Sequence, residues 1–365
     1  MDQLLAVAEQ FTPPGQVLGL REYGSGNVND TFLVTLEGAA EPYFILQRLN
    51  PRVFRRPELV MGNLRTVSDH VRRRLAVAPL SPGRRWEVPQ VRLTRDGQDH
   101  FIDPEGSFWR ALSFIEAAET FDIIKDVGQA KEVGYALGMF HGFLSDLPPE
   151  RLADTLPGFH QTPGYLKHYD EVLAQPGPRQ SPEVNYALRF VEERRTCAAV
   201  LEQARAQGRL ALRPIHGDPK VNNVMMDIAT GQAVSMVDLD TVKPGLVHYD
   251  IGDCLRSGGN PLGEETGDWE WVRFEAELCR AILTGYLSLA KGFLTEDDYA
   301  HLYDAIRLIT FELGLRFFTD YLAGNVYFKA RRPEHNLARA LVQFKLTESI
   351  EAQAAAIHAI IRELK

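Results

Sequence analysis

The chain lacks several features that would place it in a special class. Its three cysteines (Cys197, Cys254, Cys279) are odd in number and have no CxxC spacing, which argues against a disulfide framework or a zinc site. No apolar run approaches the roughly 18–20 residues of a membrane span. The start, MDQLLAVAEQF, has acids and no basic segment, which predicts no signal peptide. We therefore expect a protein of the reducing cytoplasm with no membrane partner.

An excess of positive charge is missing as well. Lys and Arg number 40 against 49 Asp and Glu, a formal net charge of −9, so the chain carries no electrostatic footprint for nucleic acid. A G-x4-G-K-S/T motif is absent, which excludes a P-loop enzyme. With 365 residues and 45 % hydrophobic side chains, the chain is long enough for one large domain or two smaller ones.

The secondary-structure pattern changes after the first hundred residues. Short strands and turns are predicted first, with one helix where apolar residues recur at helical spacing. The predicted strands are residues 19–23, 31–36, 43–49, 91–93, 100–102 and 108–114, and that helix is 57–75. Helical periodicity then dominates, in residues 128–147, 269–289, 296–322 and 336–364. In the helix at 128–147, Gly134, Gly138 and Gly142 are four residues apart, a spacing that lets another helix approach closely. The pattern predicts an α+β chain with a β-rich lobe followed by a helical lobe.

The most informative segment is residues 215–253, IHGDPKVNNVMMDIATGQAVSMVDLDTVKPGLVHYDIGD. Asp218, Lys220 and Asn223 form the D-x-K-x-x-N pattern of a kinase catalytic loop, and Asp238 closes a later apolar run. Phosphoryl transfer from ATP uses these groups: a carboxylate that orients and deprotonates the acceptor hydroxyl, an ammonium at the γ-phosphate, and an amide with a second carboxylate on Mg²⁺. We therefore predict Asp218 and Lys220 as catalytic residues and Asn223 and Asp238 as metal ligands.

Two neighbouring details of this segment bear on that prediction. Asp240 lies two residues beyond Asp238 and would point the same way on a strand, so it is the alternative ligand. Asp250 and Asp253 are expected to tie down the catalytic loop and to cap the next helix. Only twelve residues separate Asp238 from Asp250, too few for the activation segment on which protein kinases bind a peptide. The acceptor should therefore be small.

Together, His216-Gly217-Asp218 with Asn223, and residues 234–238 ending in Asp238, resemble the aminoglycoside phosphotransferase/choline kinase superfamily. The stretches GSGNVNDTF, FWRALSFIE, HGDPKVNN with VDLDTVKPGL, and LGLRFFTDYLAGNVYF are most similar to its N-acetylhexosamine 1-kinase-like branch. The resemblance implies a bilobal, protein-kinase-like fold. Residues 1–115 would form an N-terminal nucleotide-binding lobe, and residues 116–365 a helical lobe with the catalytic loop and the acceptor pocket.

The resemblance also implies a nucleotide site in the N-terminal lobe. Gly24, Ser25 and Gly26 would form a glycine turn over the phosphates of ATP. Strand alignment places Arg48 where kinases have their phosphate-binding lysine, with Gln47 on the opposite side and Glu58 as one candidate partner. The segment 113–116, which includes Phe114 and Glu116, would join the lobes and bind adenine through its backbone groups, with Phe114 and Ile115 as apolar cover. The alternative is that these residues only pack the lobe junction.

For the acceptor, the resemblance implies contacts from Asn27, Asp218, Arg316 and Tyr327. Asn27 replaces a His that is frequent in this branch, which leaves the substrate preference open. Arg316 has an alternative partner in Asp320, one helical turn away. Tyr327 could equally belong to the core. His160 and Thr162 also match positions of the family, without an assigned role.

These observations predict an ATP- and Mg²⁺-dependent kinase, a monomer or homodimer, that phosphorylates the anomeric hydroxyl of an N-acetylhexosamine. N-acetylglucosamine and N-acetylgalactosamine are the favoured acceptors. Another small alcohol (glucosamine, choline, homoserine or an aminoglycoside) is the alternative within enzymes. A nucleotide-binding pseudokinase that acts as a regulator is the alternative outside them, against which the intact catalytic loop argues.

Overall fold

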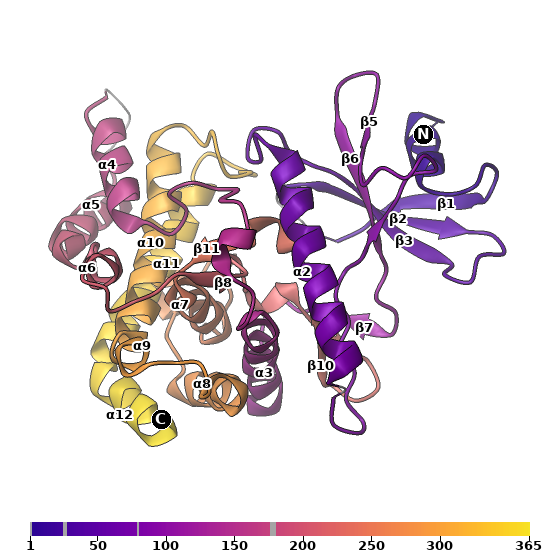
Figure 1. Cartoon of the computed structure of the whole chain (residues 1–365). Helices are drawn as coiled ribbons and strands as arrows, with labels where there is room; N and C mark the ends of the chain where they lie inside the picture. The colour runs from indigo at the N-terminus through magenta and orange to yellow at the C-terminus, as the bar shows by residue number, and fades with distance from the viewer. Residues whose placement is uncertain (1, 25–27, 79, 176–179) are drawn as a thin grey trace.

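The structure, a computed structural model, describes residues 2–24, 28–78, 80–175 and 180–365. Two lobes are visible in Figure 1, an antiparallel sheet with few helices and a larger assembly of helices. The predicted two-lobe α+β architecture is confirmed. Within the described ranges, no helix is both long and apolar enough to cross a bilayer.

The N-terminal lobe is built on one antiparallel sheet. Its strands are β1 (Val17–Glu22), β2 (Asp30–Leu36), β3 (Tyr43–Arg48), β4 (Val91–Arg92), β5 (Phe101–Ile102) and β6 (Phe108–Ser113). They pair in the order β1-β2-β3-β6-β4, with β5 added to β6. One face buries Phe44, Leu46 and Trp109 against Val7 and Ala8 of α1 (Asp2–Ala8). Because side chains alternate along a strand, the residues between these point to the other face, toward the helical lobe.

Helix α2 (Pro57–Val77) runs along the junction of the two lobes (Figure 1). It begins with Pro57, whose fixed φ suits the first helical position, and its buried residues recur at helical spacing. The amide of Asn63, in this buried stripe, donates to the carbonyls of Ala153 and Val242. The helix therefore ties the first lobe to two loops of the second.

The second lobe contains most of the helices and two small sheets. Its helices are α3 (Val127–Leu144), α4 (Thr162–Leu173), α5 (Pro182–Arg194), α6 (Val200–Ala206), α7 (Val247–Gly258), α8 (Ala276–Ala290), α9 (Glu296–Ala300), α10 (Leu302–Leu322), α11 (His335–Ala352) and α12 (Ala354–Leu364). Its strands are β7 (Ala118–Glu119), β8 (Arg213–Ile215), β9 (Val224–Asp227), β10 (Ala233–Met236) and β11 (Lys243–Gly245). They pair as β10-β9-β7 and as β11-β8. The proposed boundary after residue 115 falls between β6 of the first sheet and β7, which pairs with β9.

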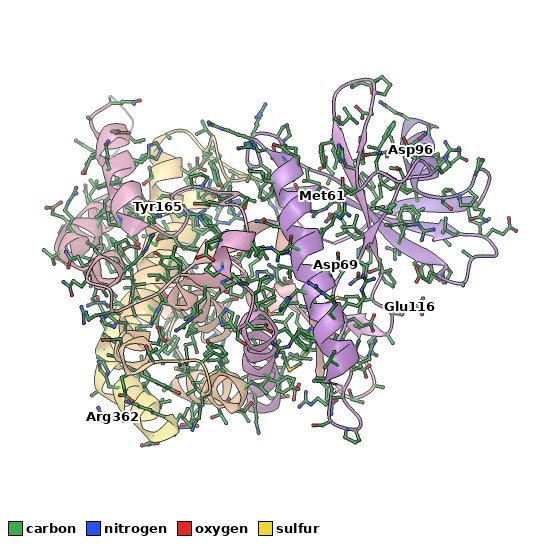
Figure 2. All side chains as sticks on the ribbon, viewed as in Figure 1. Met61, Asp69, Asp96, Glu116, Tyr165 and Arg362 are labelled. Atoms are coloured by element: carbon green, nitrogen blue, oxygen red, sulfur yellow. The ribbon has the colours of Figure 1, made fainter. Side chains whose placement is uncertain are left out.

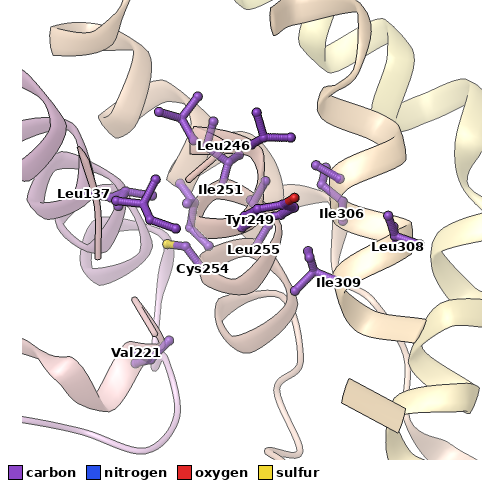
Figure 3. Packing of buried hydrophobic residues seen from close by; sticks show 14 of the residues in the cluster. Leu137, Val221, Leu246, Tyr249, Ile251, Cys254, Leu255, Ile306, Leu308 and Ile309 are labelled. Atoms are coloured by element: carbon purple, nitrogen blue, oxygen red, sulfur yellow. The ribbon is translucent and has the colours of Figure 1, made fainter. Parts of the chain in front are cut away.

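Helix α7 lies at the centre of the core of this lobe. Figure 3 shows its Ile251, Cys254 and Leu255 between Leu137 of α3 and Ile309 of α10. All five side chains are at most 2 % exposed. The catalytic loop, which precedes α7 in the sequence, is therefore anchored to a dry and closely packed scaffold.

The predicted close approach at the glycines of α3 is confirmed at two of three positions. A Cβ on Gly134 would lie 1.8 Å from the carbonyl oxygen of Ile282, and one on Gly138 would lie 2.8 Å from that of Tyr286. Gly142 has nothing within 4 Å of such an atom. Glycine is therefore required only where α3 crosses α8.

Three long helical predictions had wrong boundaries. The helix expected at 269–289 starts only at Ala276, after a short 3-10 turn at Trp269–Trp271. The segments 296–322 and 336–364 are each divided into two helices, at His301 and at Gln353. Neither junction contains proline or glycine, and the apolar period continues through both, so the sequence pattern does not mark the change of direction.

Candidate active site

The catalytic loop connects β8 to β9 and ends in a 3-10 turn, Val221–Asn223. Gly217 has φ +85°, and a Cβ there would lie 2.7 Å from the carbonyl oxygen of Thr241. Only glycine therefore fits between His216 and Asp218. The imidazole of His216 donates through Nε2 to the carbonyl of Val237 at 3.0 Å, which connects the loop to the segment carrying Asp238.

Asp250, on α7, holds the backbone of this loop. Its carboxylate accepts the backbone N–H groups of His216 at 2.7 Å and Gly217 at 2.8 Å, together with Nε2 of His141 at 2.9 Å. The expectation that Asp250 ties down the loop is confirmed. Asp253 pairs with Arg256 instead, and α7 begins after Leu246, so neither carboxylate caps the helix.

The predicted catalytic side chains meet within this loop. Nζ of Lys220 lies 2.8 Å from Oδ2 of Asp218, and the amide nitrogen of Asn223 donates to the carbonyl and to Oδ2 of the same residue. Burial alone would raise the pKa of Asp218, but the adjacent Lys220 outweighs it, and the pKa is lowered. Asp218 is therefore an ionised carboxylate that can accept a proton.

A cavity of about 320 Å³ lies between the sheet and the catalytic loop. Its walls are apolar where Ile45, Leu112 and Phe114 line it, and polar toward Asn223 and Asp238. The apolar part suits a flat base, and the polar part suits its phosphates. Asp218 and Lys220 lie at the end of this cavity.

Two acidic residues after β10 differ in their surroundings. Asp238, in a left-handed conformation with φ +63°, projects into the open cavity. Although solvent reaches its side chain, the protein around it and repulsion from Asp240 and Asp218 raise the pKa of Asp238 to about 7. Asp240 is 2 % exposed, and its carboxylate meets Arg110 at 2.5 Å and Asn29 at 2.6 Å.

Asn223 and Asp238 fit a magnesium ion by donor chemistry. The amide nitrogen of Asn223 is already donating, so its oxygen is the atom left for a cation, and the converging carboxylates favour positive charge. The described residues contain no cluster of three or more His, Cys, Asp or Glu that could hold an ion without help. A two-residue site completed by phosphate oxygens is consistent with that finding.

A second cavity, of about 750 Å³, opens on the other side of Asp218 and Lys220. Arg316 and Tyr327 both line it, as do residues of the loop at 325–333. The guanidinium of Arg316 lies over the rings of Phe159, Tyr165 and Phe328, at 5.0, 5.1 and 5.5 Å. Asp218 and Lys220 of the catalytic loop, together with Val28, therefore line both cavities.

Comparison with known proteins agrees with this arrangement. The model of the "Phosphotransferase enzyme family" matches residues 19–291. The chain belongs to the phosphotransferase enzyme family. Among solved structures, the choline kinase of Cryptosporidium parvum Iowa II is similar, with a TM-score of 0.62, 13 % identity, and 97 % of this chain and 96 % of that one covered.

Two further structures show the same phosphotransferase fold. A microcompartment-associated aminopropanol kinase has a TM-score of 0.56 and 15 % identity, with 97 % of this chain and 98 % of that one covered. A spectinomycin phosphotransferase in complex with ADP and spectinomycin has a TM-score of 0.55 and 12 % identity, with 93 % of each chain covered. The predicted kinase-like fold is thereby confirmed, while identities this low show the fold alone.

Several residues predicted for the nucleotide lie elsewhere in this phosphotransferase or cannot be placed. Gly24 lines the first cavity, whereas Ser25, Gly26 and Asn27 lie outside the described residues. Arg48 is on the outer face of β3, where its guanidinium pairs with Asp30 at 2.6 Å. The side chain that β3 presents to the cavity is Gln47.

Of Phe114, Glu116 and Glu58, three candidate residues of the nucleotide site, only Phe114 lines the first cavity. It also contacts the rings of Tyr23 and Tyr43. The exposed side chain of Glu116 is not part of the cavity lining and lies at the edge of the molecule in Figure 2. Glu58 is exposed and pairs with Arg56, so the structure does not bring it to Arg48.

Asp320 has a different role from the one considered for it. Its carboxylate accepts the backbone N–H groups of Val326, Tyr327 and Phe328 and the side-chain amide of Asn336. It therefore shapes the loop that carries Tyr327. Arg316 forms no ion pair or hydrogen bond with the part of the chain that the structure describes, so its charge is balanced at longer range.

A buried pair beside the second cavity, formed by His160 and Glu312, was not found from the sequence. Nδ1 of His160 lies 2.9 Å from Glu312 of α10, and its Nε2 donates to the carbonyl of Gly217 at 2.8 Å. The hydroxyl of Thr162 donates to the other oxygen of Glu312 at 2.7 Å. Burial would lower the pKa of His160, but the carboxylate of Glu312 outweighs it and the pKa is raised. The pair therefore holds the carbonyl of Gly217, whose N–H group is held by Asp250.

Proposed function

We propose that this protein is an ATP- and Mg²⁺-dependent kinase that transfers the γ-phosphoryl group to a hydroxyl of a small neutral sugar. The favoured acceptor is an N-acetylhexosamine, phosphorylated at its anomeric hydroxyl. The observation that carries the proposal is the position of Asp218 and Lys220 in the wall between two cavities. A nucleotide in the first cavity and an alcohol in the second would meet there.

The catalytic loop supports an in-line transfer. Asp218 is ionised and can orient the acceptor hydroxyl and take its proton, while Lys220 offsets charge on the transferred group. Asn223 and Asp238 would hold Mg²⁺, which supplies charge compensation on the phosphates when bound. The loop is held rigidly by Asp250 and His160, so positioning supplies much of the rate.

Charge around the acceptor cavity supports a neutral acceptor over a cationic one. Each carboxylate in its lining already has a cationic partner: Asp218 with Lys220, Asp253 and Glu264 with Arg256, and Glu312 with His160. Arg52, Arg316, Lys329, Arg331 and Arg332 line the same cavity without an ion pair to any described residue. An ammonium group would therefore enter a region of positive potential.

The aromatic residues of this cavity argue in the same direction. A quaternary ammonium such as choline is bound by a cage of aromatic rings. Phe159, Tyr165 and Phe328 form such a cage, and the guanidinium of Arg316 occupies it. A sugar hydroxyl or acetamido carbonyl can instead accept a hydrogen bond from Arg316.

A cationic alcohol is the second candidate, because solved structures of this fold include a choline kinase and an aminopropanol kinase. The test is ³¹P NMR of the products formed with ATP and Mg²⁺ from N-acetylglucosamine, N-acetylgalactosamine, glucosamine, homoserine, choline, aminopropanol and spectinomycin. We expect an anomeric phosphate signal from an N-acetylhexosamine. A 6-phosphate signal would overturn the position assigned, and turnover of the amines alone would overturn the acceptor.

A further inference from the structure

The face that the N-terminal sheet turns toward the nucleotide cavity has no cation on β3. Gln47 occupies the cavity-facing position of that strand, and Arg48 points to the outer face. A kinase needs positive charge near the phosphates of the nucleotide. The question is which side chain supplies or organises it.

Arg110, on β6, lies directly across from Gln47 in the sheet register. It is 1 % exposed and lines the nucleotide cavity. Its Nε and Nη2 donate to Oε1 of Gln47 at 3.0 and 2.7 Å, and the amide of Gln47 donates in turn to the hydroxyl of Thr31. The three residues form a polar row across β2, β3 and β6, and this row holds the guanidinium in one orientation.

The same guanidinium forms an ion pair with the second lobe. Its Nη2 lies 2.5 Å from Oδ1 of Asp240, in the 3-10 turn that follows Asp238. The other oxygen of Asp240 accepts the amide of Asn29, at 2.6 Å, from the residue that precedes β2. Two points of the N-terminal lobe therefore converge on one carboxylate that is two residues from the candidate metal ligand.

A buried ion pair of this kind is seldom a net source of stability, since desolvation of both charges offsets their attraction. Such pairs are better explained by the geometry that they enforce. Nη1 of Arg110 and Oδ1 of Asp240 are both buried and have no hydrogen-bond partner among the described residues, so the two charges form an ion pair that leaves one guanidinium nitrogen without an acceptor. A buried donor without an acceptor is unfavourable unless a ligand supplies one, and the adjacent cavity is the one that suits a nucleotide.

We propose that Arg110 replaces the strand-β3 cation as the positioning residue of the nucleotide site. Through Asp240 it fixes the sheet and the turn carrying Asp238 in one relative position, so that the phosphates and their metal are aligned with Asp218. This inference rests on the proposed use of ATP, and it assigns Asp240 to the lobe junction, leaving Asp238 for the metal.

The test compares Arg110→Met with Arg48→Met, a matched change on the neighbouring strand that removes an exposed pair with Asp30 and a contact with the ring of Trp109. Affinity for ADP, with and without Mg²⁺, is measured by calorimetry, and kcat and KM by steady-state kinetics. We expect Arg110→Met to weaken binding of Mg²⁺-ADP by ~10-fold or more, the size of a typical coupling between neighbouring groups. The KM of the acceptor should change less than twofold, and Arg48→Met should resemble the wild type.

Two further variants separate positioning from folding. Arg110→Lys keeps the charge and should recover part of the nucleotide affinity. Asp240→Asn should weaken Mg²⁺-ADP binding as Arg110→Met does, with a double variant no worse than either single one. If Arg110→Met does not fold, Arg110→Lys and Asp240→Asn replace it in the comparison with Arg48→Met.

The inference is overturned if the changes at Arg110 and Asp240 leave Mg²⁺-ADP affinity unaltered, or if Arg48→Met has the larger effect. Failure of the proposed function is distinct from both results. In that case the wild-type protein itself would bind no adenine nucleotide.

Discussion

The two cavities that meet at the catalytic loop differ in the sign of the charge they collect. Asp218, Asp238 and Asp240 converge on the nucleotide side, where desolvation by the surrounding protein and repulsion from Asp240 and Asp218 raise the pKa of Asp238. The acceptor side collects unpaired arginines, with Arg316 enclosed by aromatic rings. A carboxylate cluster prepares a site for a metal cation, whereas the arginines disfavour an ammonium group. Under the proposed function, one loop would serve both a metal site in the first cavity and an acceptor site in the second cavity that disfavours cations.

The largest effect should come from the residue that both cavities share. Asp218→Asn keeps the shape of the side chain but removes the proton acceptor, so turnover should fall by about 10²- to 10⁴-fold. Nucleotide affinity should stay within a few-fold, because the nucleotide cavity keeps its other walls. Single-turnover kinetics and calorimetry measure the two quantities. Unchanged turnover would show that Asp218 is not the base.

A substitution of Arg316 tests whether the acceptor and the nucleotide bind in separate cavities. Arg316→Ala removes a charged donor, worth about 1.5–3 kcal/mol, so the KM of an N-acetylhexosamine should rise roughly 10- to 150-fold. The KM of ATP should not change. Arg307→Ala is the control, since Arg307 lies on the same helix and pairs with Asp304. Equal effects of Arg316→Ala on both KM values would contradict the separation of the two cavities.

A change in the packing of α3 against α8 should lower the stability of the protein as a whole and should not affect one cavity more than the other. A Cβ at Gly285 of α8 would lie 1.9 Å from the carbonyl oxygen of Lys131, so Gly285→Ala forces α3 and α8 apart. We expect a loss of about 1–3 kcal/mol in the free energy of unfolding, or more. Gly142→Ala, where nothing lies within 4 Å, should be neutral or stabilising. Urea denaturation measures both, and equal stabilities would refute the close contact.

The smallest effect concerns His160 and Glu312 on the acceptor side. The folded pKa of His160 is raised above its unfolded value of about 6.5. The stability from the ion pair is therefore fully present below about pH 6.5 and is lost as pH rises through the folded pKa. Glu312→Gln should destabilise the protein most near pH 6 and less at pH 9, as thermal unfolding would show.

Thr162→Val provides the control for this pH dependence. It removes the hydrogen bond to the other oxygen of Glu312 without changing a titrating group. Its cost should be the same across the pH range. A cost of Glu312→Gln that is likewise independent of pH would mean that the imidazole is neutral beside Glu312.

The sequence predicted the parts of the site that are close together along the chain. Asp218, Lys220, Asn223 and Asp238 belong to one short segment, and the turn and hairpin between them are local structures. The alternation of side chains along β3 also predicted that Gln47 and Arg48 point to opposite faces of the sheet. It could not show which of the two faces the cleft, because that depends on which face of the sheet packs on α1. Arg110 was missed for the same reason.

The chemistry of one contiguous loop and the two-lobe order of strands and helices follow from residue types at short spacing, so the sequence was enough to predict both. The distant residues that support the loop became visible only in the folded chain. His160 and Glu312 are 152 positions apart, and Asn29 and Asp240 are 211 apart. Pairs so far apart are brought together by the packing of helices and the docking of lobes. Local sequence patterns in a single chain predict neither of these.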